Sequence, residues 1–328
     1  MKVSIVGGSG FIGTRLVELL LQRGNEVVIV DKAMSAQYPA LTRIADVRDE
    51  AALDQVIDAD SDVVIHLAAE HKDNVHPIEL YYEVNVQGMR NLLSVLGRKG
   101  IKQIVFTSSV AIYGLNEGDS TEESPIAPFN DYGKSKYQAE QVLEEWTAQD
   151  ITRSAVVLRP CVVFGERNRG NVYNLLHSIV NKSFMMVGKG NNHKSMGYVG
   201  NLCEFIAFLL THGIATGVNV YNYADKPDLT MKQLVAVVES TLGRKLIRLR
   251  IPYWLGIMGG TFFDFVAWIR RKPMTISSIR IKKFCASTVV NANKAHAIGF
   301  TPSYTLPDAL KRTIEYEFPE HCSHKVPR

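Results

Sequence analysis

The most constraining feature of the chain is a glycine-rich turn between an apolar run and an amphipathic segment. Val3–Gly7 is typical of a buried strand, and Phe11–Arg23 of a helix with one apolar face. Three glycines between and within them form a Gly-x-x-Gly-x-x-Gly pattern. Such a turn lets the backbone approach a pyrophosphate, which then lies at a helix N-terminus where N–H groups and the helix dipole favour an anion. The residues expected to bind a dinucleotide here are Gly7, Gly10, Phe11, Ile12 and Gly13.

An acidic residue after the turn indicates which dinucleotide is bound. Asp31 ends the expected strand Glu26–Asp31, eighteen residues after Gly13. Its carboxylate can accept a hydrogen bond from the adenosine ribose 2′-OH and would repel a 2′-phosphate, so the sequence predicts NAD rather than NADP. Lys32 follows directly and is also expected at the cofactor. Asp46-Val47, after the next strand-like stretch, are expected at the adenine.

The first half of the chain alternates strand and helix patterns, which predicts a doubly wound parallel sheet with helices on both faces. Further strands are expected at Asp62–Leu67, Gln103–Ser108 and Ala155–Arg159, and helices at Glu79–Arg98 and Asp131–Ala148. The alternation breaks down after Pro160, where strands are expected at Val218–Asn222 and Leu246–Ile251 and helices at Met231–Leu242 and Thr305–Phe318. We therefore expect an α/β Rossmann domain over 1–160, with chain crossings up to about 225, and a smaller substrate-binding lobe over 161–328.

A tyrosine and a lysine lie four residues apart at the start of one expected helix. Tyr132 and Lys136 therefore project from the same helix face. An ammonium beside a phenol favours the phenolate and lowers its pKa, and such a tyrosine can move a proton near neutral pH. Ser108-Ser109 end the preceding strand, where a hydroxyl can orient a substrate oxygen. We expect Ser109, Tyr132 and Lys136 to be catalytic, with a surface tyrosine and lysine on a helix as the alternative.

These residues together resemble the extended short-chain dehydrogenase/reductase family, which includes the sugar-nucleotide epimerases and dehydratases. The motifs that carry the resemblance are Gly7 to Gly13, Asp31, His66-Leu67-Ala68-Ala69, Asn85, Ser109, Tyr132 and Lys136. The dehydratases have an Asp-Glu pair where this chain has Ser109-Val110, which argues against elimination of water. The resemblance implies further NAD contacts from Leu67, Ala68, Ala69, Asn85, Ser108, Tyr132, Lys136 and Pro160.

The second half is similar to the bacterial N-acetylglucosaminyl-diphospho-undecaprenol 4-epimerases of O-antigen assembly. The similar segments are 164–174, 194–201 and 277–286. Lys194-Ser195 stand where soluble UDP-sugar epimerases place Arg-Asp, and Val162 where an asparagine often reaches substrate, so an ordinary uridine pocket is disfavoured. The resemblance implies substrate contacts from Ser109, Asn171, Lys194 and Arg280.

The resemblance also implies a mechanism. Tyr132, as phenolate, removes the proton of the sugar 4-hydroxyl, Ser109 hydrogen-bonds that oxygen, and a hydride passes from carbon 4 to NAD and returns on the other face. Lys136 lowers the pKa of Tyr132 and holds the nicotinamide ribose. Two enzymatic alternatives remain: a UDP-sugar 4-epimerase, and an NAD(P)H-dependent reductase of a nucleotide-linked 4-keto-6-deoxy sugar, which consumes its cofactor. A dinucleotide-sensing regulator is disfavoured by the intact catalytic set.

The charge of the chain is concentrated in one segment. Its net charge is only +4, which does not suggest general nucleic-acid binding. Between Ser240 and Pro307, however, eleven lysines and arginines accompany a single acid, Asp264. The apolar run 253–269 within this segment contains Asp264 and three glycines and is too short to span a membrane. Segment 251–283 is either a buried helix or a flap over the substrate pocket, or an interfacial element that rests on the anionic leaflet of the inner membrane. The resemblance to the lipid-linked epimerases favours contact with the membrane or the polyprenyl chain.

Four cysteines, Cys161, Cys203, Cys285 and Cys322, show no paired spacing, which favours reduced thiols in the cytoplasm over disulfides. No secretory signal pattern precedes the first strand. No histidine or cysteine spacing indicates a metal site. The family resemblance implies a homodimer that pairs through the helices expected at 79–98 and 131–148.

Overall fold

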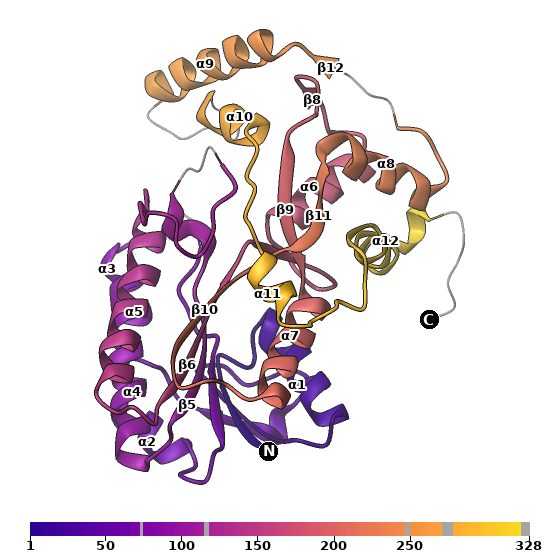
Figure 1. Cartoon of the computed structure of the whole chain (residues 1–328). Helices are drawn as coiled ribbons and strands as arrows, with labels where there is room; N and C mark the ends of the chain where they lie inside the picture. The colour runs from indigo at the N-terminus through magenta and orange to yellow at the C-terminus, as the bar shows by residue number, and fades with distance from the viewer. Residues whose placement is uncertain (73–74, 115–117, 247–249, 271–277, 323–328) are drawn as a thin grey trace.

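The computed structural model describes residues 1–72, 75–114, 118–246, 250–270 and 278–322. Its centre is a seven-stranded sheet in the order β10-β6-β5-β4-β1-β2-β3, and every neighbouring pair of strands is parallel (Figure 1). The strands are β1 (Lys2–Val6), β2 (Glu26–Asp31), β3 (Thr42–Ile44), β4 (Val63–His66), β5 (Gln103–Thr107), β6 (Ser154–Pro160) and β10 (Gly217–Tyr223).

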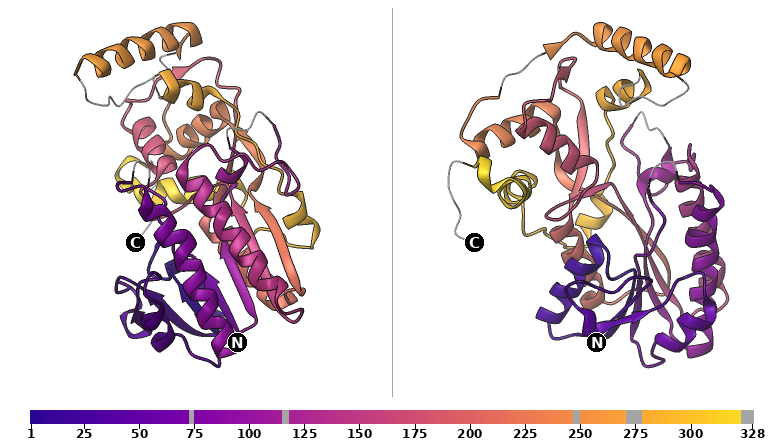
Figure 2. Two further views of the ribbon diagram at one scale, coloured as in Figure 1. Left: turned by 90° about the vertical axis from the view of Figure 1, so that its left-hand side faces the viewer. Right: turned by 180° about the vertical axis from the view of Figure 1, so that it is seen from behind.

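Helices cover both faces of this sheet (Figures 1 and 2). On one face α1 (Phe11–Gln22) packs against α7 (Val199–His212), and on the other lie α2 (Glu50–Val56), α4 (Gly88–Lys99) and α5 (Asp131–Ala148). Successive strand residues point to opposite faces, so Ile5 of β1 belongs to one core and Val6 to the other. The expected doubly wound Rossmann fold is confirmed.

The second half of the chain builds a smaller lobe and also returns to the main sheet, because β10 pairs with β6 along its whole length. In the lobe, β7 (Val162–Phe164), β9 (His193–Tyr198) and β11 (Asp225–Thr230) form a sheet in the order β11-β9-β7, while β8 (Met186–Val187) pairs with β12 (Arg250–Ile251). The remaining helices are α6 (Asn171–Val180), α8 (Met231–Leu242), α9 (Tyr253–Arg270), α10 (Ser278–Cys285), α11 (Asn293–Ala297) and α12 (Leu306–Glu317). Short turns of helix are η1 (Pro39–Leu41), η3 (Val110–Tyr113) and η4 (Pro319–His321).

Side-chain caps explain why two helices have the expected bounds. The Asn130 side-chain carbonyl accepts the Gly133 N–H at 2.9 Å, which fixes the start of α5. Thr230 and Gln233 form a reciprocal capping box at the start of α8, and Gly243 ends that helix with φ 61°. Both α5 and α8 agree with the sequence-based ranges.

The helix expected at Glu79–Arg98 is interrupted. It consists of α3 (Glu79–Tyr82), a π-helical turn η2 (Glu83–Gln87) and then α4. Buried Asn85 lies in the π turn, a feature that often marks functional positions. The strand expected at Leu246–Ile251 is reduced to the two residues of β12, and residues 247–249 lie outside the described part of the chain.

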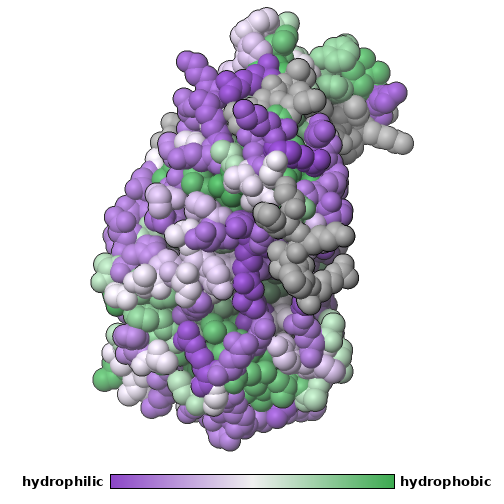
Figure 3. All heavy atoms as spheres, turned by 90° about the vertical axis from the view of Figure 1, so that its right-hand side faces the viewer, coloured by the Kyte–Doolittle hydropathy of each residue, from purple (hydrophilic) through white to green (hydrophobic). Residues whose placement is uncertain are grey.

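Helix α9 forms the end of the molecule farthest from the main sheet (Figures 1 and 2). Several large hydrophobic side chains of α9 are exposed, and hydrophobic residues are visible at this end of the surface among hydrophilic ones (Figure 3). Within the described ranges, no helix combines the length and the apolar character needed to cross a bilayer.

Alanine substitutions at Gly7 and Gly24 distinguish the effect of a steric clash from the effect of backbone strain alone. Gly7 and Gly24 have φ +85° and +75°, but a Cβ at Gly7 would lie 2.4 Å from the Ala68 nitrogen, whereas nothing lies within 4 Å of one at Gly24. We expect Gly24→Ala to lower the free energy of unfolding by about 1 kcal/mol and Gly7→Ala by about 3 kcal/mol or more, because the β1–β4 junction must shift. Urea unfolding followed by circular dichroism measures both; equal losses would contradict the expectation.

Candidate active site

The site lies at the edge of the sheet where the parallel strands β1, β2, β4 and β5 end, since ligands of doubly wound sheets bind outside the carboxyl ends of the strands. Backbone hydrogen bonds join two of these ends: the N–H groups of Leu67 and Ala68 both donate to the Val6 carbonyl, at 2.7 and 3.0 Å. The segment Leu67-Ala68-Ala69 is therefore held directly beside the glycine turn.

The glycine turn has the geometry that a pyrophosphate requires. A Cβ at Gly7 would strike Ala68, and one at Gly13 would lie 2.5 Å from the Gly8 Cα, so the turn packs too tightly for side chains. Gly10 occupies the N-cap of α1 without a side-chain cap, which leaves the first N–H groups of this 12-residue helix to a ligand. Phe11 and Ile12 begin α1 and are half-buried against the core.

Asp31 is held in place at the end of β2. Its two carboxylate oxygens accept the N–H groups of Ser9 and Ala33, each at 3.0 Å. Each oxygen retains a lone pair that can accept a hydrogen bond from a ribose hydroxyl. Asp31 and the glycine turn together therefore fit the adenosine end of NAD. Lys32 beside it is exposed.

The residues expected at the adenine differ in environment. The Arg48 guanidinium donates to the Asp46 carboxylate at 2.8 and 3.1 Å and holds the pKa of that carboxyl below its usual range. Val47 is buried against α4, where a Cβ at Gly88 would lie 2.7 Å from the Val47 side chain.

Asn85 connects the segment after β4 to the start of α5. Its side-chain carbonyl accepts the Glu70 N–H at 2.9 Å, and its amide donates to the Glu70 carbonyl at 3.0 Å and to the Ser135 hydroxyl at 2.9 Å. The Ser135 hydroxyl donates in turn to the Tyr132 carbonyl at 2.9 Å. This chain of bonds positions the first turn of α5, which carries Tyr132.

The structure brings Ser109 and Tyr132 together. Ser109 is the N-cap of η3, where its hydroxyl accepts the Ala111 N–H at 3.2 Å, and the same hydroxyl lies beside the Tyr132 phenol. Burial raises the pKa of Tyr132, and the hydrogen bond with Ser109 only partly opposes this rise. The protein alone thus raises the pKa of Tyr132, contrary to the lowering that its spacing from Lys136 predicted, because burial disfavours the charged phenolate.

Lys136 is buried one helical turn after Tyr132. Burial lowers the pKa of its ammonium to about 7, and the Glu140 carboxylate opposes this shift. Its Nζ lies 4.5 Å from the centroid of the Phe106 ring and forms no hydrogen bond within the described residues, so its donors remain for ribose hydroxyls. Ser108, also expected at NAD, has a buried hydroxyl without a hydrogen-bond partner among the described residues. Both observations fit a bound dinucleotide.

A buried ion pair behind Lys136 escaped the sequence analysis. Glu140 accepts from Arg159 at 2.7 Å, and Arg159 also donates to the Tyr113 hydroxyl at 2.8 Å. Tyr113 in turn donates to Asn222 of β10 at 2.7 Å. The available signal was the position of Glu140, four residues after Lys136 and hence on the same helix face.

Three of the four residues expected to contact substrate, Asn171, Lys194 and Arg280, belong to the smaller lobe. Asn171 is exposed at the start of α6 and, within the described residues, forms no hydrogen bond to Ser109, Tyr132 or Lys136. Lys194 of β9 donates from Nζ to the Ala286 carbonyl at 2.6 Å, and burial lowers its pKa. Arg280 belongs to α10, with its side chain outside the described part of the structure. Pro160 is buried at the end of β6.

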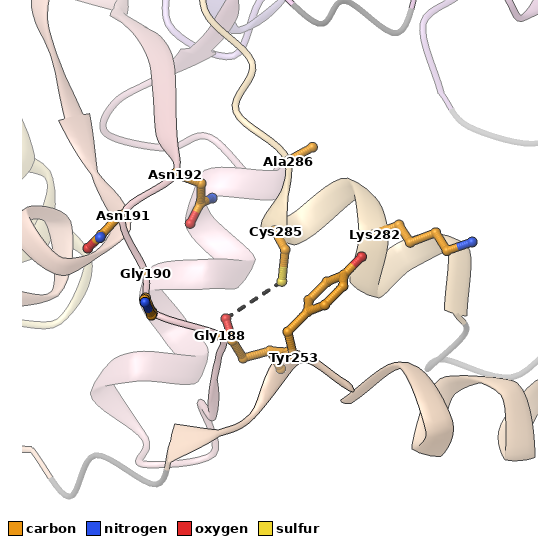
Figure 4. A pocket seen from close by; sticks show the side chains of 10 residues that line it. Gly188, Gly190, Asn191, Asn192, Tyr253, Lys282, Cys285 and Ala286 are labelled. Carbon is orange, nitrogen blue, oxygen red and sulfur yellow. Dashed lines mark hydrogen bonds between the residues drawn. The ribbon is translucent and has the colours of Figure 1, made fainter. Parts of the chain in front are cut away.

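A pocket of about 390 Å³ lies between the turn after β8 and the helices α9 and α10 (Figure 4). Lys189 and Lys282 give its lining a positive charge, and Tyr253 is the first residue of α9. The Cys285 thiol donates to the Val187 carbonyl at 3.6 Å across its base. The sequence analysis did not identify this pocket, since its lining comes from three separate segments.

Comparisons with known proteins agree with this geometry. Residues 3–224 match the NAD dependent epimerase/dehydratase family model. The chain is 53% identical over 318 residues to the N-acetyl-alpha-D-glucosaminyl-diphospho-ditrans,octacis-undecaprenol 4-epimerase of Escherichia coli O157:H7, covering 97% of this chain and 95% of that protein. It is 26% identical to the UDP-glucose 4-epimerase of Vibrio cholerae, covering 96% and 94%.

Two solved structures share the fold. The UDP-glucose 4-epimerase of Thermus thermophilus in complex with NAD superposes with a TM-score of 0.73 at 24% identity, covering 96% of this chain and 98% of that one. The UDP-N-acetylglucosamine 4-epimerase of Bacillus cereus gives 0.75 at 17% identity, covering 97% and 99%. The Rossmann sheet and the smaller lobe are thus a shared architecture.

The pKa of Lys136 predicts how stability changes with pH. An unfolded chain keeps the lysine proton up to about pH 10.4, whereas folded Lys136 loses it near pH 7. Between these values the unfolded state binds more protons, so this residue makes the free energy of unfolding rise with pH, by at most about 1.4 kcal/mol per unit. Lys136→Met lacks this contribution.

Urea unfolding of the wild type and of Lys136→Met between about pH 7 and pH 9 tests this linkage. The wild type should gain stability relative to the variant as the pH rises. A constant difference would contradict the low pKa of Lys136.

Proposed function

The chain belongs to the NAD-dependent epimerase/dehydratase family, and we propose that it interconverts N-acetylglucosamine and N-acetylgalactosamine on an undecaprenyl diphosphate carrier. It is an isomerase of this family, its cofactor is NAD, and its substrate is a sugar diphosphate. The observation that carries the proposal is the 53% identity to the lipid-linked 4-epimerase along nearly the whole of both chains.

In this proposal the two parts of the fold bind different ligands. Residues 1–160, with the returning segments up to about 225, hold NAD at the glycine turn and Asp31. Residues 161–328 mainly hold the sugar diphosphate, with Asn171, Lys194 and Arg280 as its contacts. The proximity of Lys194 to the end of α10 supports a common role for this strand and that helix.

The catalytic residues handle a proton at one oxygen of the sugar. When bound, NAD supplies a hydride acceptor for carbon 4 and a cationic nicotinamide ring. The Tyr132 phenolate takes the proton of the 4-hydroxyl, and the Ser109 hydroxyl donates a hydrogen bond to the resulting oxygen. Tyr132 later returns the proton to the same oxygen. Because burial raises the pKa of Tyr132 and lowers that of Lys136 to about 7, the proposal requires the positive charge of bound NAD, together with protonated Lys136, to stabilise the phenolate.

The carrier determines where the enzyme works. A polyprenyl chain remains in the bilayer, so a protein acting on its diphosphate meets the substrate at the membrane surface. We place the enzyme at the cytoplasmic face of the inner membrane, in the synthesis of O-antigen or another surface polysaccharide. We include in the proposal a homodimer that pairs through the helices α4 and α5.

Two parallel assays without added reductant test the substrate. One contains N-acetylglucosaminyl-diphospho-polyprenol and the other UDP-N-acetylglucosamine, and sugar composition after hydrolysis reports carbon 4 inversion. We expect product with the lipid-linked substrate and no net consumption of cofactor. Product with the UDP-sugar alone would contradict the carrier, and stoichiometric use of NAD(P)H on a 4-keto sugar would point to a reductase instead.

Replacement of Tyr132 by phenylalanine tests the proton step. We expect Tyr132→Phe to reduce kcat by about 10²-fold or more, because general acid–base catalysis contributes that much. NAD released on denaturation and measured by chromatography should be unchanged. Tyr137→Phe, on the same helix and half-buried, is the matched control and should retain activity. Near-normal turnover of Tyr132→Phe would refute the assignment.

A further inference from the structure

We propose that the outward face of helix α9 inserts into the interfacial region of an anionic phospholipid bilayer and so docks the enzyme on the membrane. The inference rests on the proposed function, because a lipid-linked substrate is what brings the enzyme to a bilayer. Helix α9 would make the contact, so the end of the molecule that carries α9 would meet the lipid.

The polarity of α9 is the reverse of that in an ordinary surface helix. Large apolar side chains recur every three or four residues, which places them on one face, and all of them are exposed. The exposed fractions are 63% for Trp254, 60% for Met258, 62% for Phe262, 57% for Phe265 and 75% for Trp268. An apolar patch of this kind on the end of a protein marks a binding surface (Figure 3).

On the opposite face of α9, glycines allow the helix to pack closely against the rest of the protein. A Cβ at Gly256 would lie 2.6 Å from the Val187 side chain, and one at Gly260 would lie 2.7 Å from the Ser278 Cα. Turning the helix to bury its aromatic side chains would place them where these glycines now touch β8 and α10. The close packing therefore holds the apolar face outward, which disfavours a flap that covers the substrate with its aromatic residues.

The charges around α9 complement an anionic surface. Its one acid, Asp264, is turned toward α10, where its carboxylate accepts the Ser278 N–H at 3.1 Å. Arg250 just before the helix, Arg270 at its end and Lys282 on α10 are all exposed. Aromatic residues flanked by basic ones are the composition of helices that lie in the interface of anionic membranes.

A second copy of the chain fits this face less well than a bilayer does. In a symmetric pair the same patch meets itself, and an antiparallel pairing of α9 would place Arg250 and Arg270 of the two copies near each other. Anionic head groups instead neutralise these charges. The pocket of Figure 4 opens beside the start of α9, so docking would bring Lys189 and Lys282 close to the level of the head groups.

Vesicle binding of the full chain tests the inference. The protein is floated with vesicles of phosphatidylcholine and phosphatidylglycerol and, separately, of phosphatidylcholine alone. We expect co-flotation with the anionic vesicles, weaker binding to the neutral ones, and a decrease with added salt. Tryptophan emission should shift to shorter wavelength on binding, because Trp254 and Trp268 are exposed whereas Trp146 is already buried.

Two glutamate variants test whether vesicle binding depends on α9 or on exposed hydrophobic residues anywhere on the surface. Trp268→Glu combined with Phe265→Glu should weaken vesicle partitioning about tenfold or more, because the apolar contact is lost and negative charge is added. Ile151→Glu is the matched control: Ile151 is 90% exposed on the Rossmann domain, after α5, and its variant should bind vesicles like the wild type. Thermal unfolding checks that the variants remain folded.

The outcomes distinguish this inference from the proposed function. Epimerisation of a detergent-dispersed lipid-linked sugar without any vesicle binding would overturn the α9 inference and leave the function intact. Vesicle binding that depends on α9, with activity on UDP-sugar alone, would support the inference and overturn the carrier. Light scattering that shows a dimer dissociating in Trp268→Glu without lipid would assign the face to a second copy and refute membrane docking.

Discussion

All seven strands of the main sheet run in parallel, and this arrangement determines where the chemistry can take place. The carboxyl ends of β1, β2, β4 and β5 meet at one edge, so the glycine turn, Asp31, Leu67 and Ser109 converge although up to about a hundred residues separate them. The contact of Gly7 with Ala68 joins two of these ends so closely that a methyl group does not fit. The cofactor site thus follows from strand direction and from backbone packing more than from any side chain.

Three separate interactions fix helix α5, which carries Tyr132 and Lys136, along its length. The Asn130 cap fixes its start, the bond from Asn85 to Ser135 fixes its first turns, and the ion pair of Glu140 with Arg159 fixes its middle. Tyr132 and Lys136 lie between these points. A buried ion pair is costly to desolvate, and such pairs serve position more readily than stability. Here Glu140 also opposes the loss of the Lys136 proton, so the pair acts on geometry and charge together.

The sequence predicted most accurately what local patterns determine. The bounds of α5 and α8 agreed because capping residues and apolar periodicity coincide there, and the tight turn between β1 and α1 was evident from its glycines. The three-stranded sheet of the lobe was not expected, since β7, β9 and β11 pair across long separations along the chain. The pKa of Tyr132 was expected to fall because spacing reveals a neighbouring charge but not burial, which raises this pKa. The sequence did not distinguish a flap from an interfacial helix at 253–269. Composition does not show that the face of α9 with Gly256 and Gly260 packs against the protein.

The distribution of charge along the chain bears on the orientation that the proposed membrane contact would have. Segment 240–307 carries +10, from eleven cations and one acid, and since the whole chain is +4 the remainder carries −6. Its exposed Arg250, Arg270 and Lys282 lie on or beside α9 and α10, at the end of the molecule opposite the Rossmann sheet (Figure 1), whereas Lys294 lies over the Tyr221 ring of β10. An anionic surface therefore attracts one end and repels the other before any apolar side chain touches lipid. The positive charge thus lies at the same end as the apolar face of α9. Electrostatics and the hydrophobic effect would therefore favour one orientation, with the lobe toward the bilayer and the NAD domain away from it.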